Sequence, residues 1–103
     1  MAGGRNDDRI EVENVNHPGR TSRLDRKSYE HIRDVLLGFL PATPPGLTYA
    51  EMAEGVRARA SQELFPGGAR VGWWLKSVQL DLEAKGVLQR AKDRGPTRWS
   101  RKA

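Results

Sequence analysis

The sequence predicts an α+β domain with three helices, a C-terminal β-hairpin and an N-terminal strand or arm. An amphipathic segment, residues 72–86, ends at a glycine that suits the left-handed conformation of a helix C-terminus. A short basic segment follows, and the tight link over residues 93–96 requires its two predicted strands to pair antiparallel. Two further helices are predicted upstream. This order of elements is the outline of a winged helix-turn-helix, with the hairpin as its wing.

The N-terminal part is predicted to be extended. Residues 1–8 are small and polar and are expected to be disordered, with one domain over residues 9–103. Apolar and acidic residues alternate at the start of residues 10–15, which indicates a strand. Residues 16–19 contain Pro18 and Gly19 in the order of a β-turn, and residues 21–24 are compatible with a second extended segment.

Start and stop signals define the helices. Asp25 is a good N-cap for a first helix over residues 26–40, and Thr48 with Glu51 has the spacing of a capping box for a second helix. A third helix is expected over residues 70–85, and Trp99 is expected to anchor the second strand of the wing on the core. The apolar side chains that keep helical spacing and are predicted to be buried are Tyr29, Ile32, Leu36, Phe39, Leu40, Met52, Val56, Ala60, Val71, Trp74, Leu75, Val78 and Leu82.

Positive charge is concentrated at the C-terminal end. The chain has 18 Lys and Arg against 13 Asp and Glu, a net charge of +5. Seven of these cations and a single acid fall in residues 84–103, so the rest of the chain is close to neutral. Such a patch is an electrostatic footprint for polyanions, although charged side chains also protect exposed edge strands from aggregation. The candidate phosphate contacts are Arg90, Lys92, Arg94, Arg98 and Arg101.

The outer face of the third helix is only partly suited to reading DNA bases. Lys76, Ser77 and Gln79 could contact base edges, but Trp73 and Leu80 lie side by side on the same projected face. Asp81 and Glu83 are expected to repel phosphates. Exposed apolar residues at this spacing indicate a covered surface or an interface.

Two candidates could cover Trp73 and Leu80: a second copy of the chain, or the N-terminal segment folding back. In the second case the segment could add to the wing as an edge strand. Glu11 and Glu13 could then pair across strands with Arg90, Lys92 or Arg98.

Composition argues against several classes of function. The chain has no cysteine, which excludes disulfides and thiolate metal sites and makes the cytoplasm the expected location. No apolar run is long enough to span a membrane. His17 and His31 have no partner at metal-ligand spacing, so neither a metal nor a cofactor is expected. No nucleophile motif is present, and an enzyme, or a ligand-binding protein using His17, is the least favoured interpretation.

The chain also resembles a family of small, functionally uncharacterised bacterial proteins over about residues 10–100. The segments that carry the resemblance are residues 13–20 (ENVNHPGR), 45–52 (PGLTYAEM), 64–69 (LFPGGA), 72–86 (GWWLKSVQLDLEAKG) and 98–99 (RW). This resemblance implies no activity and no catalytic residues. More coarsely, residues 47–87 are similar to winged-helix proteins of the bacterial regulator type, in which the third helix is the recognition helix. The link over residues 61–69 is longer than the turn of a simple helix-turn-helix.

The function expected from these observations is binding. The first hypothesis is a DNA-binding, transcription-associated module that contacts phosphates through the wing, with Lys76, Ser77 and Gln79 as groove contacts. The alternative is a protein–protein interaction or homodimerisation module that uses Trp73 and Leu80 and does not bind DNA.

Overall fold

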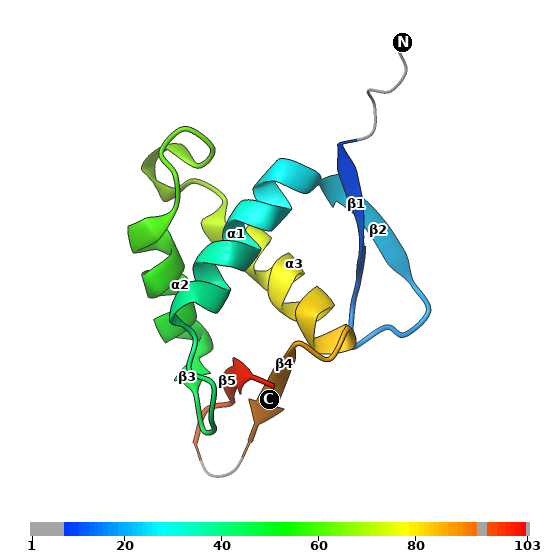
Figure 1. Ribbon diagram of the computed structural model, residues 1–103, viewed down its shortest axis with the longest axis vertical. Helices are drawn as coiled ribbons and strands as arrows, with labels where there is room; N and C mark the ends of the chain where they lie inside the picture. Colours follow the sequence, from blue (N-terminus) through cyan, green and yellow to red (C-terminus); the bar gives the residue numbers. More distant parts are fainter. Residues whose placement is uncertain (1–7, 93–94, 103) are drawn as a thin grey trace.

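The structure is a computed structural model that describes residues 8–92 and 95–102. Three helices pack around one core, a two-stranded hairpin lies along one side, and a small three-stranded sheet lies at the lower end in this view (Figure 1). The α+β class, the three helices, the N-terminal strand and the C-terminal hairpin are as predicted. Residues 1–7, the larger part of the segment expected to be disordered, lie outside the described residues.

The N-terminal strands pair with each other. β1 (Arg9–Glu13) runs antiparallel to β2 (Thr21–Asp25), with Glu13 opposite Thr21. The link turns at residues 17–20, where the Arg20 amide donates to the His17 carbonyl over 3.2 Å and Gly19 adopts a φ of 89°. The prediction that the N-terminal segment adds to the wing is therefore wrong. β1 pairs instead with β2, which follows it in the chain and needs only a short turn to lie beside it.

The first two helices begin at the predicted caps. The Asp25 carboxylate accepts a hydrogen bond from the Ser28 amide, 3.0 Å away, at the start of α1 (Arg26–Phe39). Thr48 and Glu51 form a reciprocal capping box at the start of α2 (Tyr49–Arg59). These bonds satisfy amides that the first helical turn leaves without a partner.

A plug in the core precedes the third helix. Phe65 is buried between the helices, and a single 3-10 turn, η2 (Pro66–Gly68), leads from it to α3 (Val71–Ala84). The helix ends as predicted, with Gly86 at a φ of 77° and the Val87 amide bonded to the Leu82 carbonyl over 2.8 Å. α3 therefore lies against both α1 and α2 and points its C-terminus toward the wing (Figure 1).

The wing is part of a three-stranded sheet. β4 (Leu88–Ala91) pairs antiparallel with β5 (Arg98–Arg101), and β5 also pairs with β3 (Leu47–Thr48), a strand that was not predicted. Trp99 on β5 is buried, as expected. β3 directly precedes α2, and β4 follows α3. The wing is therefore connected to the helical core at the start of α2 and at the end of α3.

One continuous core holds these elements together. Its buried apolar residues are Val12, Tyr29, Ile32, Leu36, Leu40, Met52, Ala53, Val56, Ala60, Phe65, Val71, Leu75, Val78, Leu82, Leu88 and Trp99. Phe39 and Trp74, which were predicted to be buried, pack against this core and are only half-buried. Val12 brings the N-terminal hairpin into the same core as the helices. In the described part of the chain, none of the helices is long and apolar enough to cross a membrane.

Candidate functional site

Arg90 on the wing is held by a carboxylate of α3. Arg90 Nε lies 2.7 Å from Glu83 Oε1 and Arg90 Nη2 lies 3.0 Å from Glu83 Oε2, so the two side chains form a bidentate pair. The hydrogen bond to Glu83 raises the pKa of the Arg90 guanidinium. Trp99 Nε1 donates to the same carboxylate over 2.9 Å, so Glu83 joins the end of α3 to both strands of the wing. Part of the charge of Arg90 is thereby neutralised.

The other cations of the wing differ in the hydrogen bonds and ion pairs that they form. Arg98 donates to the Gly46 carbonyl over 3.3 Å and lies 3.5 Å from Glu51, and Arg101 Nε donates to the Leu40 carbonyl over 3.0 Å. Lys92 and Lys102 are exposed, and neither forms an ion pair with a described residue. Arg94 lies outside the described residues. We call Arg90, Lys92, Arg98, Arg101 and Lys102 the wing surface.

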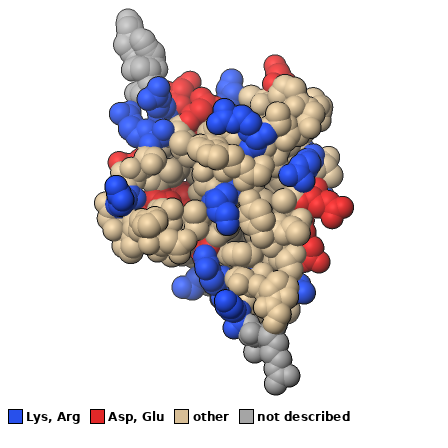
Figure 2. All heavy atoms as spheres, turned by 180° about the vertical axis from the view of Figure 1, so that it is seen from behind, with Lys and Arg blue, Asp and Glu red and all other residues tan. Residues whose placement is uncertain are grey.

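Two aromatic rings connect the wing surface to Lys76 on α3. The Lys76 ammonium lies 4.5 Å from the centre of the Tyr49 ring, and that ring lies 6.4 Å from the Trp99 ring in an edge contact. On the other side, the Arg90 guanidinium lies 5.6 Å from the centre of the Trp99 ring. Lys76 thus adds a cation beside the wing. In the rear view, blue side chains lie over much of this face: one group lies toward the wing end, and others lie beside red side chains at the upper end and right side (Figure 2).

The outer face of α3 is less accessible than predicted. Gln79 is fully buried and donates to Glu83, so its assignment as a base contact is wrong. Asp81 is also fully buried and does not face a phosphate, and the Glu83 side chain is only 6% exposed. The helical projection placed these residues near the surface because it could not show which tertiary elements cover that side of the helix.

Asp81 joins the N-terminal hairpin to the helices. Its carboxylate accepts hydrogen bonds from the Tyr29 hydroxyl and from the Glu13 amide, the latter over 2.7 Å, and forms an ion pair with Lys85 at 2.7 Å. Lys85 also donates to the Glu11 carbonyl over 3.4 Å. The predicted pairing of Glu11 and Glu13 with Arg90, Lys92 or Arg98 is wrong, because these acids stand on a hairpin that is fastened to α3.

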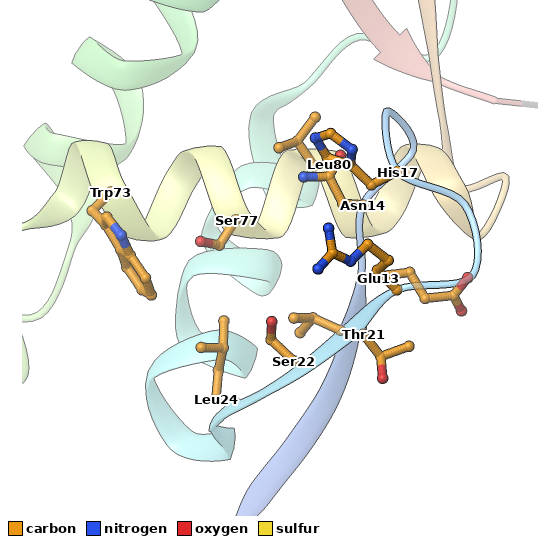
Figure 3. Close-up of a pocket in the computed structure, with 11 residues that line it drawn as sticks. Glu13, Asn14, His17, Thr21, Ser22, Leu24, Trp73, Ser77 and Leu80 are labelled. Carbon is orange, nitrogen blue, oxygen red and sulfur yellow. The ribbon is translucent and has the colours of Figure 1, made fainter.

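The hairpin covers part of the predicted interface and leaves a groove beside it. Leu80 and Ser77 become half-buried, whereas Trp73 stays 48% exposed. The groove between the hairpin and α3 has a volume of about 350 Å³. We call it the hairpin groove; it is lined by Val12, Glu13, Asn14, His17, Arg20, Thr21, Ser22, Leu24, Trp73, Ser77 and Leu80 (Figure 3). The expectation that the N-terminal segment folds back over this face is thus confirmed in part.

A family model matches residues 9–99, which cover the hairpin, the three helices and the wing to Trp99. The chain belongs to a family of unknown function (DUF6958). No curated protein and no solved structure matches this chain. The family assignment agrees with the resemblance seen in the sequence and assigns no activity.

The groove brings together two of the segments that carry the family resemblance. Residues 13–20 form its turn side and residues 72–86 its helix side. Sequence reasoning singled out Trp73, Leu80 and His17. It missed Asn14, which falls in the predicted strand over residues 10–15, and Arg20, which follows the predicted turn. Within residues 8–92 and 95–102, no three His, Cys, Asp or Glu side chains are grouped to hold a metal ion.

Proposed function

We propose that this protein is a cytoplasmic, nucleic-acid-associated binding module that contacts phosphates through the wing surface and Lys76. The observation that carries the proposal is the charge of the wing. Residues 86–92 and 95–102 contain five cations and no acid, and they form one edge of the molecule. Lysine and arginine side chains that neutralise phosphates supply sequence-independent affinity for nucleic acid.

The partly covered outer face of α3 favours contacts with phosphates over contacts with bases. A helix that reads the major groove needs a free outer face with side chains that match base edges. Here the N-terminal hairpin lies along that face, and Gln79 is buried. Ser77 lines the hairpin groove, so Lys76 is the one of the three candidate base contacts that is exposed beside the wing. We therefore expect strong salt dependence and weak sequence preference.

Fluorescence anisotropy of labelled duplex DNA at several salt concentrations tests the proposal. The test variant is Lys76→Gln/Lys92→Gln/Lys102→Gln, which keeps the structural Arg90–Glu83 pair. We expect it to weaken binding by at least about tenfold and to lower the slope of log K against log salt by about 0.9 for each phosphate that is no longer neutralised.

The matched control removes the same charge elsewhere. Arg9→Gln/Lys27→Gln/Arg57→Gln changes three exposed cations on β1, α1 and α2 and gives the same net charge. It should bind within about twofold of the parent. Equal weakening in both triple variants would mean that net charge alone drives binding, and no binding by the parent at low salt would end the proposal.

Protein–protein interaction or homodimerisation through Trp73 is the second candidate. It is favoured by the 48% exposure of this large ring, which offers apolar surface to a partner. Analytical ultracentrifugation of the parent and of Trp73→Ser tests it. A parent dimer that the substitution dissociates would support this candidate, and a monomeric parent would exclude homodimerisation.

A further inference from the structure

The hairpin groove has the size and composition of a small-molecule site. Sites for small ligands typically enclose about 300–1,000 Å³ and combine apolar walls with a few convergent polar groups. The groove has about 350 Å³, formed by the turn of the hairpin, the inner side of β2 and the outer face of α3. It is distinct from the wing surface, and no residue of that surface lines it.

One wall of the groove is apolar and held in place. The Trp73 ring packs edge-on against Trp74, with ring centres 5.1 Å apart, and the Arg70 guanidinium lies 5.4 Å from its centre. Leu80 lies two turns further along the same face, and Leu24 of β2 lines the strand side of the groove (Figure 3). A flat apolar group placed here would contact an aromatic ring that already has fixed neighbours, so little ordering is required on binding.

The opposite side of the groove carries a positive charge. Arg20 lines the groove from the end of the turn, and its guanidinium forms no ion pair or hydrogen bond with a described residue. His17 and Asn14 line the same side. The Glu13 side chain, the only acid of the lining, runs away from Trp73 and Ser77 (Figure 3). A planar guanidinium fits the two oxygens of a carboxylate.

These features together specify the chemistry of a ligand. We propose that the hairpin groove binds an organic carboxylate with an aromatic body, the body against Trp73 and Leu80 and the carboxylate on Arg20. Ser77, which lies on α3 between the two apolar residues, offers a hydroxyl to the ligand. The carboxylate could come from a small acid or from the C-terminus of a peptide with an aromatic last residue, because both present the same groups. This site goes beyond the proposed nucleic-acid contact.

Amide chemical shifts of the full chain in a ¹H–¹⁵N titration test the site. Phenylacetate should shift signals from residues 13–22 and 73–80 and saturate with a Kd in the millimolar range or below. Phenylacetamide keeps the ring and removes the charge, and acetate keeps the charge and removes the ring. Both should bind at least about tenfold more weakly if the site uses the two groups together.

Two substitutions separate the site from non-specific attraction. Arg20→Gln should raise the Kd for phenylacetate by at least about tenfold, whereas Lys27→Gln, which removes an exposed cation of α1, should leave it unchanged. Equal effects of the two substitutions, equal binding of phenylacetamide, or no shifts at about 10 mM phenylacetate would overturn the proposal.

A peptide arm distinguishes the two sources of the carboxylate. Acetyl-Gly-Gly-Phe with a free C-terminus is compared with its C-terminal amide at the same residues. Tighter binding of the free peptide than of phenylacetate would identify a chain end as the ligand, and weaker binding would identify a small acid. Because the test uses no DNA, its failure would not affect the proposed wing contact.

Discussion

Asp81 connects three parts of the molecule that are far apart in the sequence. Its buried carboxylate accepts hydrogen bonds from the Tyr29 hydroxyl of α1 and from the Glu13 amide of β1. It also forms an ion pair with Lys85 at the end of α3. A buried carboxylate is tolerated because charged and hydrogen-bonded partners compensate for the missing water. Burial and the hydrogen bond to Asp81 raise the pKa of the Tyr29 hydroxyl, which therefore stays a donor at every physiological pH.

Removing the Tyr29 hydroxyl should cost more stability than removing a comparable hydroxyl elsewhere. We expect Tyr29→Phe to lower the free energy of unfolding by about 1.5–3 kcal/mol, because a buried carboxylate loses a donor. Tyr49→Phe is the control, since its hydroxyl donates to the neutral Gly72 carbonyl over 2.9 Å. It should cost about 0.5–1.5 kcal/mol. Urea denaturation measures both, and equal decreases would show that Asp81 does not depend on Tyr29.

The burial of Asp81 and Gln79 could not be predicted from the residues alone. Helical spacing identified the buried apolar residues Val71, Leu75, Val78 and Leu82 of α3, because apolar residues repeat on that face. It could not identify polar residues buried by another element. The partners of Asp81 lie 52 and 68 positions away in the chain, and no local pattern encodes them.

At the scale of elements, the short strand β3 depends on a close approach between two backbones. Gly46 precedes β3 with a φ of 87°, and a Cβ there would overlap the Trp99 carbonyl of β5. Gly46→Ala should therefore lower the melting temperature strongly. Gly86→Ala is the matched control, because its φ of 77° carries the same backbone strain while the space around it is open. Calorimetry showing equal decreases would mean that β3 does not hold the wing.

The capping box of α2 gives a pH-dependent prediction. The hydrogen bond from the Thr48 amide, with a smaller contribution from Arg98, lowers the pKa of Glu51 from its ordinary 4.5. A carboxylate whose pKa is lowered by folding stabilises the fold above its unfolded pKa, and this contribution disappears as the pH falls through the folded value.

Glu51→Gln should therefore lower the melting temperature at neutral pH, and the difference from the parent should shrink below about pH 4.5. Glu54→Gln, a neighbour on α2 that is exposed and outside the capping box, is the control and should give little difference at any pH. A difference between Glu51→Gln and the parent that stays constant from pH 7 to pH 3 would contradict a role for the ionised carboxylate.

Elements with local signals were predicted well, and their assembly was not. Caps at Asp25 and Thr48, the glycine end of α3 and the turn before β2 all follow from residue types at fixed spacing. β3 has only two residues, too few for a pattern, and exists because β5 lies beside it. The place of the N-terminal hairpin depends on Val12 and Asp81, which are tertiary contacts.

At the scale of the whole molecule, two candidate surfaces use different parts of one helix. The strands that carry the wing surface lie beside the C-terminal end of α3 (Figure 1), and the hairpin groove lies along the outer face of this helix (Figure 3). The count of Lys and Arg along the sequence indicated the first surface, because its cations lie close together in the chain. The second could not be found in this way, since its two sides come from opposite halves of the chain.

The two surfaces should act independently. They share no residue, and at physiological salt their charges are screened over about 8 Å. Coupling would require an element with two arrangements that both ligands bias, whereas the Asp81 and Glu83 contacts fix the hairpin and the wing to the same rigid helix. Saturation with phenylacetate should therefore leave the affinity for DNA within about twofold.

The converse measurement exchanges the variants between the two ligands. Lys76→Gln/Lys92→Gln/Lys102→Gln should bind phenylacetate like the parent, and Arg20→Gln should bind DNA like the parent. Binding linkage is reciprocal, so the factor by which phenylacetate changes the affinity for DNA must equal the factor by which DNA changes the affinity for phenylacetate. A factor that differs from one in both ligand titrations would mean that α3 transmits the occupancy of the groove to the wing. A variant that loses affinity for both ligands and has a lower melting temperature has a damaged fold.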